Sequence, residues 1–207
     1  MRLPSIRQIL EETRSTFSRF PLVIVDAALG TAAAILLVDY EGPPGPSILF
    51  RILLAAILGI PFLTAIVLVA ERRGGGRLAV LGAQVAGAIV LAGYALTVPD
   101  DLSNSPAITL IRFLILGISL NLLVAAAPYL GKGEMNGFWH YNKSLFLRIF
   151  TAALYAIVLY AGLAIALAAL DNLFGVYDPG QRYAELWILI NGIFTTSVFL
   201  SGVPSHL

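Results

Sequence analysis

The chain has 207 residues, of which 58% are hydrophobic and only 12% are charged. Soluble domains usually contain about twice that charged fraction, so the composition indicates a membrane protein. The net charge of +1 provides no bulk attraction for nucleic acid, and no nucleic-acid partner is expected. The absence of cysteine excludes disulfides, thiolate nucleophiles and cysteine-ligated metal sites.

The first twenty residues are predicted to form a separate unit, an amphipathic helix in the membrane interface. Several side chains fall near one face of such a helix, and these are Ile6, Ile9, Leu10, Thr13 and Phe17. Arginine and glutamate lie elsewhere on the helix, which suits contact with anionic lipid. A basic tail that only fixes the topology is the alternative interpretation.

The rest of the chain, residues 21–207, is predicted to form one transmembrane domain of all-α class, a polytopic helical bundle. A spanning helix needs about 20 mostly apolar residues, and a helix satisfies its own backbone in lipid. Six stretches qualify as spans, and they cover residues 21–38, 48–70, 78–98, 108–130, 145–170 and 186–203. The intervening segments, including residues 131–144 and 171–182, are expected to be loops.

The distribution of lysine and arginine near the span ends predicts the orientation of the chain. The N-terminal segment and the second and fourth connectors are basic, whereas the first and third connectors contain no lysine or arginine. Because the bias alternates with every crossing, both termini are expected in the cytoplasm.

Asp26 is predicted to lie about one and a half turns inside the first span. A carboxylate in hydrocarbon normally faces protein or water. Gly30 and Ala33 share its helix face, so a neighbouring helix could approach closely there. Asp26 is interpreted either as a ligand for a proton or cation, or as a structural carboxyl that is paired or hydrogen-bonded.

Arg148 is predicted near the start of the fifth span, with Tyr155 on the same face in a polar stripe. Since Asp26 and Arg148 are expected at similar depth, we hypothesise that they pair or share a water-filled pocket. The alternative for Arg148 is that its guanidinium snorkels to phosphate head groups.

A second charged set, Arg51, Arg112 and Glu185, is predicted near the outer membrane face. Arg182 precedes Glu185 by three residues and is a further candidate for an ion pair. Interfacial anchoring with local ion pairs is the first interpretation, and an outer vestibule that gathers substrate is the second.

The middle of the spans contains a few polar or helix-breaking residues. Asn121 and Asn191 are mid-span amides, interpreted first as packing contacts worth about 1 kcal/mol each and second as ligand-binding groups. Pro61 is expected to kink the second span because it removes a backbone hydrogen bond. Gln84 lies in the small-residue run GAQVAGA, residues 82–88, which suits close helix packing.

Motifs for catalysis and cofactor binding are missing from the sequence. The glycines at residues 74–76 are not followed by the Gly-Lys-Ser/Thr of a phosphate-binding loop, and His140 and His206 form no His-x-x-x-His pair. No Gly-x-Ser-x-Gly elbow occurs. We therefore expect no enzyme activity, no cofactor and no metal site.

Two stretches of the second half resemble a bacterial membrane family labelled domain of unknown function 4153: residues 139–173, which begin WHYNKSLFLRIF, and residues 183–204, YAELWILINGIFTTSVFLSGVP. Weaker resemblance covers RFPLVI, residues 19–24, and LGIPFLTAIVLVAER, residues 58–72. The resemblance implies a loosely permease-like protein of the bacterial inner membrane, with no established site residues. Family members usually continue beyond the position of Pro204, so the chain is expected to be the N-terminal part of a longer protein or an unusually short member.

Two functions remain open from the sequence. One is a transporter- or permease-like protein with a polar cavity that opens to the cytoplasm. The other is a membrane scaffold or sensory or regulatory module that acts through helix packing. The expected partners are the lipid bilayer and other membrane helices or a second copy of the chain. A hydrated cavity that touches Asp26 or Asn121 favours transport, whereas a dry interior with small-residue grooves on its flanks favours a scaffold.

Overall fold

The computed structural model describes residues 16–40, 48–99, 106–130, 135–175 and 179–204. Within these ranges the chain is all-α, and six helical segments are long and apolar enough to cross a membrane, as the sequence predicts. The N-terminal unit predicted at residues 1–20 lies mostly outside the described part, of which residues 16–19 are helical.

Four single helices form the first four candidate spans. They are α2 (Pro21–Val38), α3 (Ile48–Arg72), α4 (Arg77–Thr97) and α5 (Pro106–Ala126), and α5 continues into a 3₁₀ turn, η1 (Ala127–Tyr129). Pro21 lies in the first turn of α2, where backbone N–H groups have no acceptor within the helix. The missing N–H of proline therefore costs no hydrogen bond there. In the turn between α3 and α4, Gly74 has a φ of +71°, a left-handed conformation that favours glycine.

Helix α6 (Met135–Phe174) is much longer than the predicted fifth span. Its 40 residues extend over about 60 Å, roughly twice the thickness of the hydrocarbon core. The prediction of a loop over residues 135–144 is therefore wrong. This polar segment is helical and is fixed against the end of α5, because the hydroxyl of Tyr141 donates to the carbonyl of Val124 (3.3 Å) and Asn142 Nδ2 donates to the carbonyl of Ala125 (3.2 Å).

The last candidate span is built from three pieces. Helix α7 (Pro179–Leu189) leads into a π-helical segment, η2 (Ile190–Thr195), and then into α8 (Thr196–Ser201). The loop predicted over residues 171–182 is wrong at both ends, since residues 171–174 belong to α6 and residues 179–182 to α7. The sequence predicts a single helical span over residues 186–203 and gives no sign of the π-helical segment within it.

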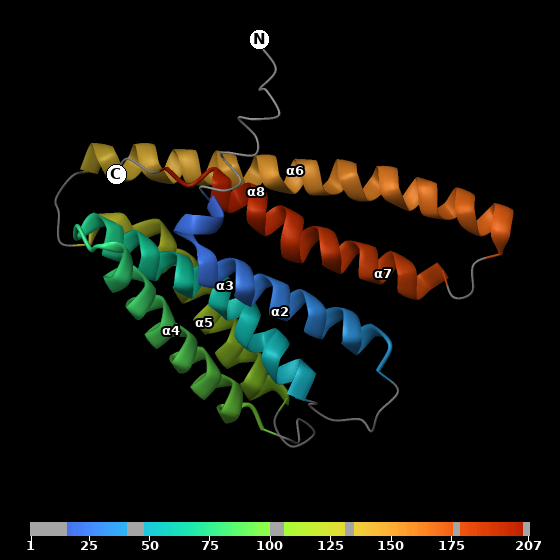
Figure 1. Cartoon of the computed structure of the whole chain (residues 1–207), viewed down its shortest axis with the longest axis horizontal. Helices are drawn as coiled ribbons and strands as arrows, with labels where there is room; N and C mark the ends of the chain where they lie inside the picture. The colour runs from blue at the N-terminus through green and yellow to red at the C-terminus, as the bar shows by residue number, and fades with distance from the viewer. Residues whose placement is uncertain (1–15, 41–47, 100–105, 131–134, 176–178, 205–207) are drawn as a thin grey trace, which may run out of the picture.

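Helix α3 lies at the centre of the molecule, in contact with α2, α4, α5 and η1, while the α7–α8 segment lies between α2 and α6 (Figure 1). Half of the most apolar stretch of α3 is buried, against 6% for the corresponding stretches of α5 and α6. Helices α5 and α6 therefore present most of their apolar side chains outward, as expected of helices that face lipid.

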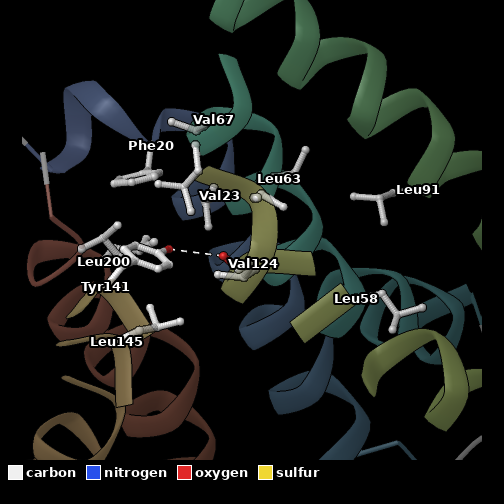
Figure 2. Packing of buried hydrophobic residues seen from close by; sticks show 14 residues of the cluster. Phe20, Val23, Leu58, Leu63, Val67, Leu91, Val124, Tyr141, Leu145 and Leu200 are labelled. Carbon is white, nitrogen blue, oxygen red and sulfur yellow. Dashed lines mark hydrogen bonds between the residues drawn. The ribbon is translucent and has the colours of Figure 1, made fainter. Parts of the chain in front are cut away.

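The buried apolar cluster lies where α2 begins and α3 ends, and it extends to the first turns of α6 and to the end of α8. Figure 2 shows Phe20, Val23 and Val67 close to Leu200 and Tyr141. In lipid such a cluster stabilises the fold through close packing rather than through removal of apolar surface from water.

Small residues set the distance between neighbouring helices. A Cβ atom added to Gly30 of α2 would lie 2.6 Å from the Cβ of Ala56 in α3, and one added to Gly87 of α4 would lie 3.0 Å from Cδ2 of Leu63. Gly192 of η2 is in similar close contact with Thr31 of α2. These three crossings are tight because glycine leaves room for the facing side chain.

Candidate functional site

A cleft opens on the side of the bundle, near the middle of the spans. It has a volume of about 570 Å³ and lies between α2, α3, α5 and the α7–η2 junction. Most of its lining is apolar or small, and the residues that form it are Ala27, Gly30, Thr31, Ala34, Leu53, Ala56, Ile57, Ile60, Pro61, Asn121, Trp187, Ile188, Asn191 and Gly192. The cleft is therefore suited to an apolar group with a few polar atoms.

The polar side chains of this lateral cleft are oriented by their own helices. Asn121 Nδ2 donates to the carbonyl of Gly117 (2.8 Å), and Asn191 Nδ2 donates to the carbonyl of Trp187 (2.9 Å). Within the described ranges neither amide bonds to another helix, so the interhelical hydrogen bonds first expected of Asn121 and Asn191 are not observed there. Their side-chain oxygens accept no hydrogen bond from the described residues, which leaves two acceptors at the cleft.

Backbone irregularities occur in two walls of the same cleft. Pro61 has no N–H, so the carbonyl of Ile57 lacks the donor that a helix normally provides, and both residues line the cleft. Helix α3 continues through Pro61, and the kink remains a prediction. On the opposite wall, the hydroxyl of Thr195 donates to the carbonyl of Ile190 (3.1 Å) across the π-helical segment. Segments of this kind occur frequently at functional sites.

Asp26 lies next to Ala27 in α2 and packs against α3. A Cβ added to Gly59 would lie 2.6 Å from Cγ of Asp26, so the carboxyl group occupies the space that glycine leaves. The Oδ2 atom is buried and has no hydrogen-bond partner in the described part of the chain. Asp26 thus packs against α3 without the pairing that the structural interpretation assumed.

The predicted ion pair between Asp26 and Arg148 is not formed. Arg148 lies instead over Gly202 at the end of α8, and a Cβ added there would lie 2.9 Å from the Cγ of Arg148. The two charged residues were expected at similar depth, but their helices turn them toward different neighbours. Tyr155, which shares the Arg148 stripe, is exposed.

A local ion pair is formed among the charged residues predicted at the outer face. Arg182 Nη1 and Glu185 Oε2 form the expected local ion pair at 3.0 Å. Glu185 also borders a second apolar groove of about 570 Å³ between α2, α6 and α7. Arg112 is exposed and Arg51 is half-buried.

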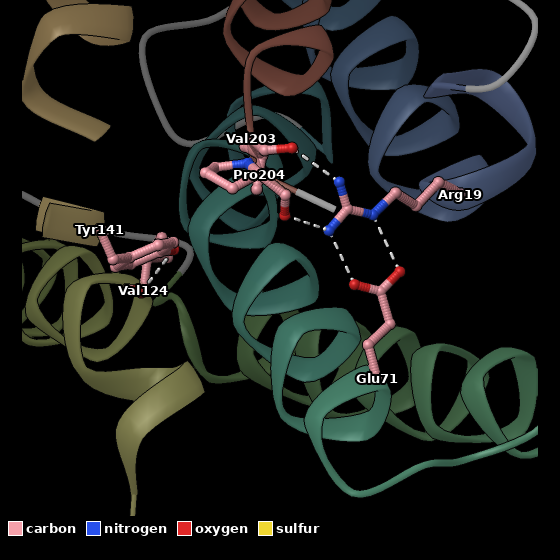
Figure 3. Close-up of polar contacts among 6 residues, drawn as sticks. All are labelled: Arg19, Glu71, Val124, Tyr141, Val203 and Pro204. Atoms are coloured by element: carbon pink, nitrogen blue, oxygen red, sulfur yellow. Dashed lines mark hydrogen bonds and ion pairs between the residues drawn. The ribbon is translucent and has the colours of Figure 1, made fainter. Parts of the chain in front are cut away.

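Sequence reasoning missed a four-bond cluster around Arg19, in which two bonds go to Glu71 (Figure 3). Arg19 Nε and Nη2 donate to the Glu71 carboxylate at 2.9 and 2.8 Å, while Nη1 and Nη2 donate to the carbonyls of Val203 (2.7 Å) and Pro204 (2.8 Å). The cluster joins the start of α2, the end of α3 and the segment after α8. The sequence contained two signals for this contact. Arg19 lies just before the first predicted span and Glu71 directly follows the second, so the predicted topology places both residues at the same membrane face.

No group of three or more His, Asp or Glu side chains in the described ranges is placed to hold a metal ion. No protein-family model, curated protein or solved structure matches the chain. The resemblance to the bacterial family of unknown function remains a prediction. The fold and the lateral cleft are therefore the basis on which function is argued.

Proposed function

We propose that the chain binds an amphipathic, lipid-like molecule in the lateral cleft, as the substrate site of a permease-like membrane protein. The observation that carries the proposal is the combination of an apolar lining with Asn121 and Asn191, which both border the cleft. An acyl or isoprenoid chain matches the apolar walls. A hydroxyl or amide on the same molecule matches the amide oxygens and the carbonyl of Ile57.

The lateral cleft is mostly apolar, so it differs from the cytoplasm-facing polar cavity that the sequence predicts for a transporter. The proposal is therefore a site reached from the bilayer and not a water-filled pathway. A polar solute would have to leave water for a mostly apolar cavity, which costs several kcal/mol without matching hydrogen bonds. A molecule already dissolved in the bilayer avoids that cost, because its chains move from lipid into a similar environment. The substrate class we propose is therefore membrane-soluble rather than ionic.

A second candidate function is helix docking, and the small residues of the cleft favour it. Ala27, Gly30 and Ala34 form a ridge on α2 that faces the cleft, and small residues allow a further transmembrane helix to approach closely. In this alternative the cleft receives a partner helix, and the protein acts as a scaffold or regulatory module.

Filling the cleft tests the first proposal. Ala34→Phe places a ring in the cavity, whereas Ala92→Phe makes the same change on the exposed surface of α4. With the purified protein in nanodiscs, we expect a photoactivatable diacylglycerol analogue to label α2, α3 or α7. Ala34→Phe should lower this labelling severalfold, and Ala92→Phe should leave it unchanged. Equal labelling of both variants would contradict a binding site in the cleft.

Movement of lipid tests the permease-like part of the proposal. In proteoliposomes, wild-type protein should increase the rate at which a fluorescent diacylglycerol analogue crosses between leaflets, and Ala34→Phe should abolish the increase. Specific labelling without any crossing would refute transport and would leave a binding or regulatory role. Cross-linking of a second protein at residue 34, in place of the lipid analogue, would support helix docking.

A further inference from the structure

A polar cavity of about 280 Å³ lies beside Arg19 and Glu71, apart from the lateral cleft. The start of α2, the end of α3 and the first two turns of α4 enclose it. This end of the bundle is the one that the lysine and arginine distribution predicts to be cytoplasmic. The polar residues in its lining are Ser18, Arg19, Glu71, Arg77 and Gln84.

Gln84 contributes an unsatisfied donor to this polar cavity. Its side chain is 0% exposed, and Oε1 accepts a hydrogen bond from the backbone N–H of Leu22 at 3.2 Å. That bond fixes the orientation of the amide, because Nε2 carries only donors and could not replace Oε1. Nε2 is buried and has no hydrogen-bond partner within the described ranges. A buried donor without an acceptor is costly, so an acceptor that enters the cavity would be stabilised there.

The charges around the cavity favour an anion as that acceptor. Arg19 and Glu71 neutralise each other through their two hydrogen bonds. Arg77 makes no ion pair with any described residue and is the first residue of α4. The N-cap residue of α4, Gly76, provides no side-chain cap, so the first N–H groups of the helix remain available at its positive end.

We propose that this cavity binds the phosphate group of an anionic phospholipid. Arg77 and the start of α4 supply positive potential, and the amide of Gln84 supplies the buried donor. Apolar side chains continue from the cavity along the outside of α4, where Leu78, Leu81 and Val85 are exposed. The phosphate would therefore lie at head-group depth while the acyl chains follow α4. Basic pockets between transmembrane helices are established sites for anionic head groups.

Native mass spectrometry of the full chain, released from detergent with phosphatidylglycerol, tests this inference. Arg77→Gln removes the cation, and Gln84→Glu keeps the acceptor for Leu22 but removes both donors and adds a negative charge. We expect each variant to lower the affinity for phosphatidylglycerol about tenfold, as for loss of one charge-assisted contact. Arg73→Gln is the matched control, because Arg73 is exposed and does not line the cavity.

The possible results distinguish a specific lipid site from general attraction to the basic surface and from a site for soluble phosphate. Equal losses in Arg73→Gln and Arg77→Gln would show general attraction to the basic surface and would overturn the site. Unchanged affinity in both cavity variants would also overturn it and would indicate that water satisfies Gln84. Inorganic phosphate is added in a parallel experiment at the same concentration. If it displaces the lipid completely, the ligand is a soluble phosphate and the lipid assignment is wrong. If Gln84→Glu does not fold, Arg77→Gln and its control decide the question.

Discussion

Arg19 shows how one side chain can join three distant parts of this membrane protein. Its guanidinium donates to both oxygens of Glu71 and to the carbonyls of Val203 and Pro204. The side chains of Arg19 and Glu71 are 17% and 31% exposed, so water screens this pair less than a surface pair. The fork of donors on arginine matches a carboxylate in a way that a lysine ammonium cannot.

Replacing Arg19 with lysine should therefore weaken the protein despite the unchanged charge. Arg19→Lys loses the two-point contact with Glu71 and at least one carbonyl bond, at an expected cost of about 1–3 kcal/mol. Arg182→Lys provides the control, since the pair between Arg182 and Glu185 joins adjacent turns and its arginine is 59% exposed. Exposed pairs contribute about 0–1 kcal/mol.

The measurement is thermal unfolding of both variants in detergent, followed by fluorescence of the two tryptophans. Arg19→Lys should lower the apparent melting temperature by several degrees, and Arg182→Lys should leave it nearly unchanged. Similar melting temperatures for Arg19→Lys and wild type would show that the cluster does not stabilise the fold.

Among the helices, the contact of α2 with α3 depends on the absence of side-chain atoms at a few positions. Gly30 meets Ala56, and Gly59 meets the carboxyl of Asp26. Without a strong hydrophobic driving force in lipid, such close contacts supply much of the attraction between helices. Glycines elsewhere are not equivalent, since a Cβ atom at Gly93 of α4 would meet nothing within 4 Å.

The same substitution should therefore have opposite effects on two helices. Gly30→Ala brings two Cβ atoms to 2.6 Å and must push α2 away from α3, with an expected loss of about 1–3 kcal/mol. Gly93→Ala fills open space and should be neutral or stabilising by about 0.5–1 kcal/mol, because alanine favours the helix. Chemical unfolding in mixed micelles would measure both changes, and a stabilising Gly30→Ala would contradict the crossing.

Comparison of the helices with the predicted spans shows which features of the fold can be read from the sequence. The apolar centres of the spans could be predicted, because lipid imposes both their length and their helical state. The first ten residues of α6 could not be recognised as part of a span, since they include polar residues such as Asn136 and Lys143. In the structure, contacts such as the hydrogen bond of Tyr141 to Val124 hold this segment against α5. Nothing in the sequence of η2, INGIFT, distinguishes a π-helical segment from an α-helical turn.

The candidate site illustrates the same limit. Sequence reasoning selected Asn121, Asn191 and Pro61 as unusual residues, and all three line the lateral cleft. Their meeting could not be predicted, because helical spacing gives the face of each residue but not the neighbour that the face meets. The same uncertainty made the pairing of Asp26 with Arg148 wrong and concealed the contact between Arg19 and Glu71.

For the whole molecule, the distribution of exposed side chains indicates a bilayer environment. The long helices α5 and α6 have large apolar side chains on their outer surfaces, including Leu114, Ile118, Phe150 and Val158. In water such surfaces would promote association, whereas in lipid they require no partner. The ligands proposed for the lateral cleft and for the polar cavity beside Arg19 both depend on this setting, because each would enter from the bilayer.

Cysteine accessibility tests this setting most directly, because the chain contains no cysteine of its own. Gly76→Cys and Pro99→Cys place one thiol at each end of α4, and both positions are exposed. In intact cells, a membrane-impermeant maleimide should label Pro99→Cys at once and Gly76→Cys only after permeabilisation. Labelling of both thiols from the same side would contradict a helix that crosses the membrane between residues 76 and 99.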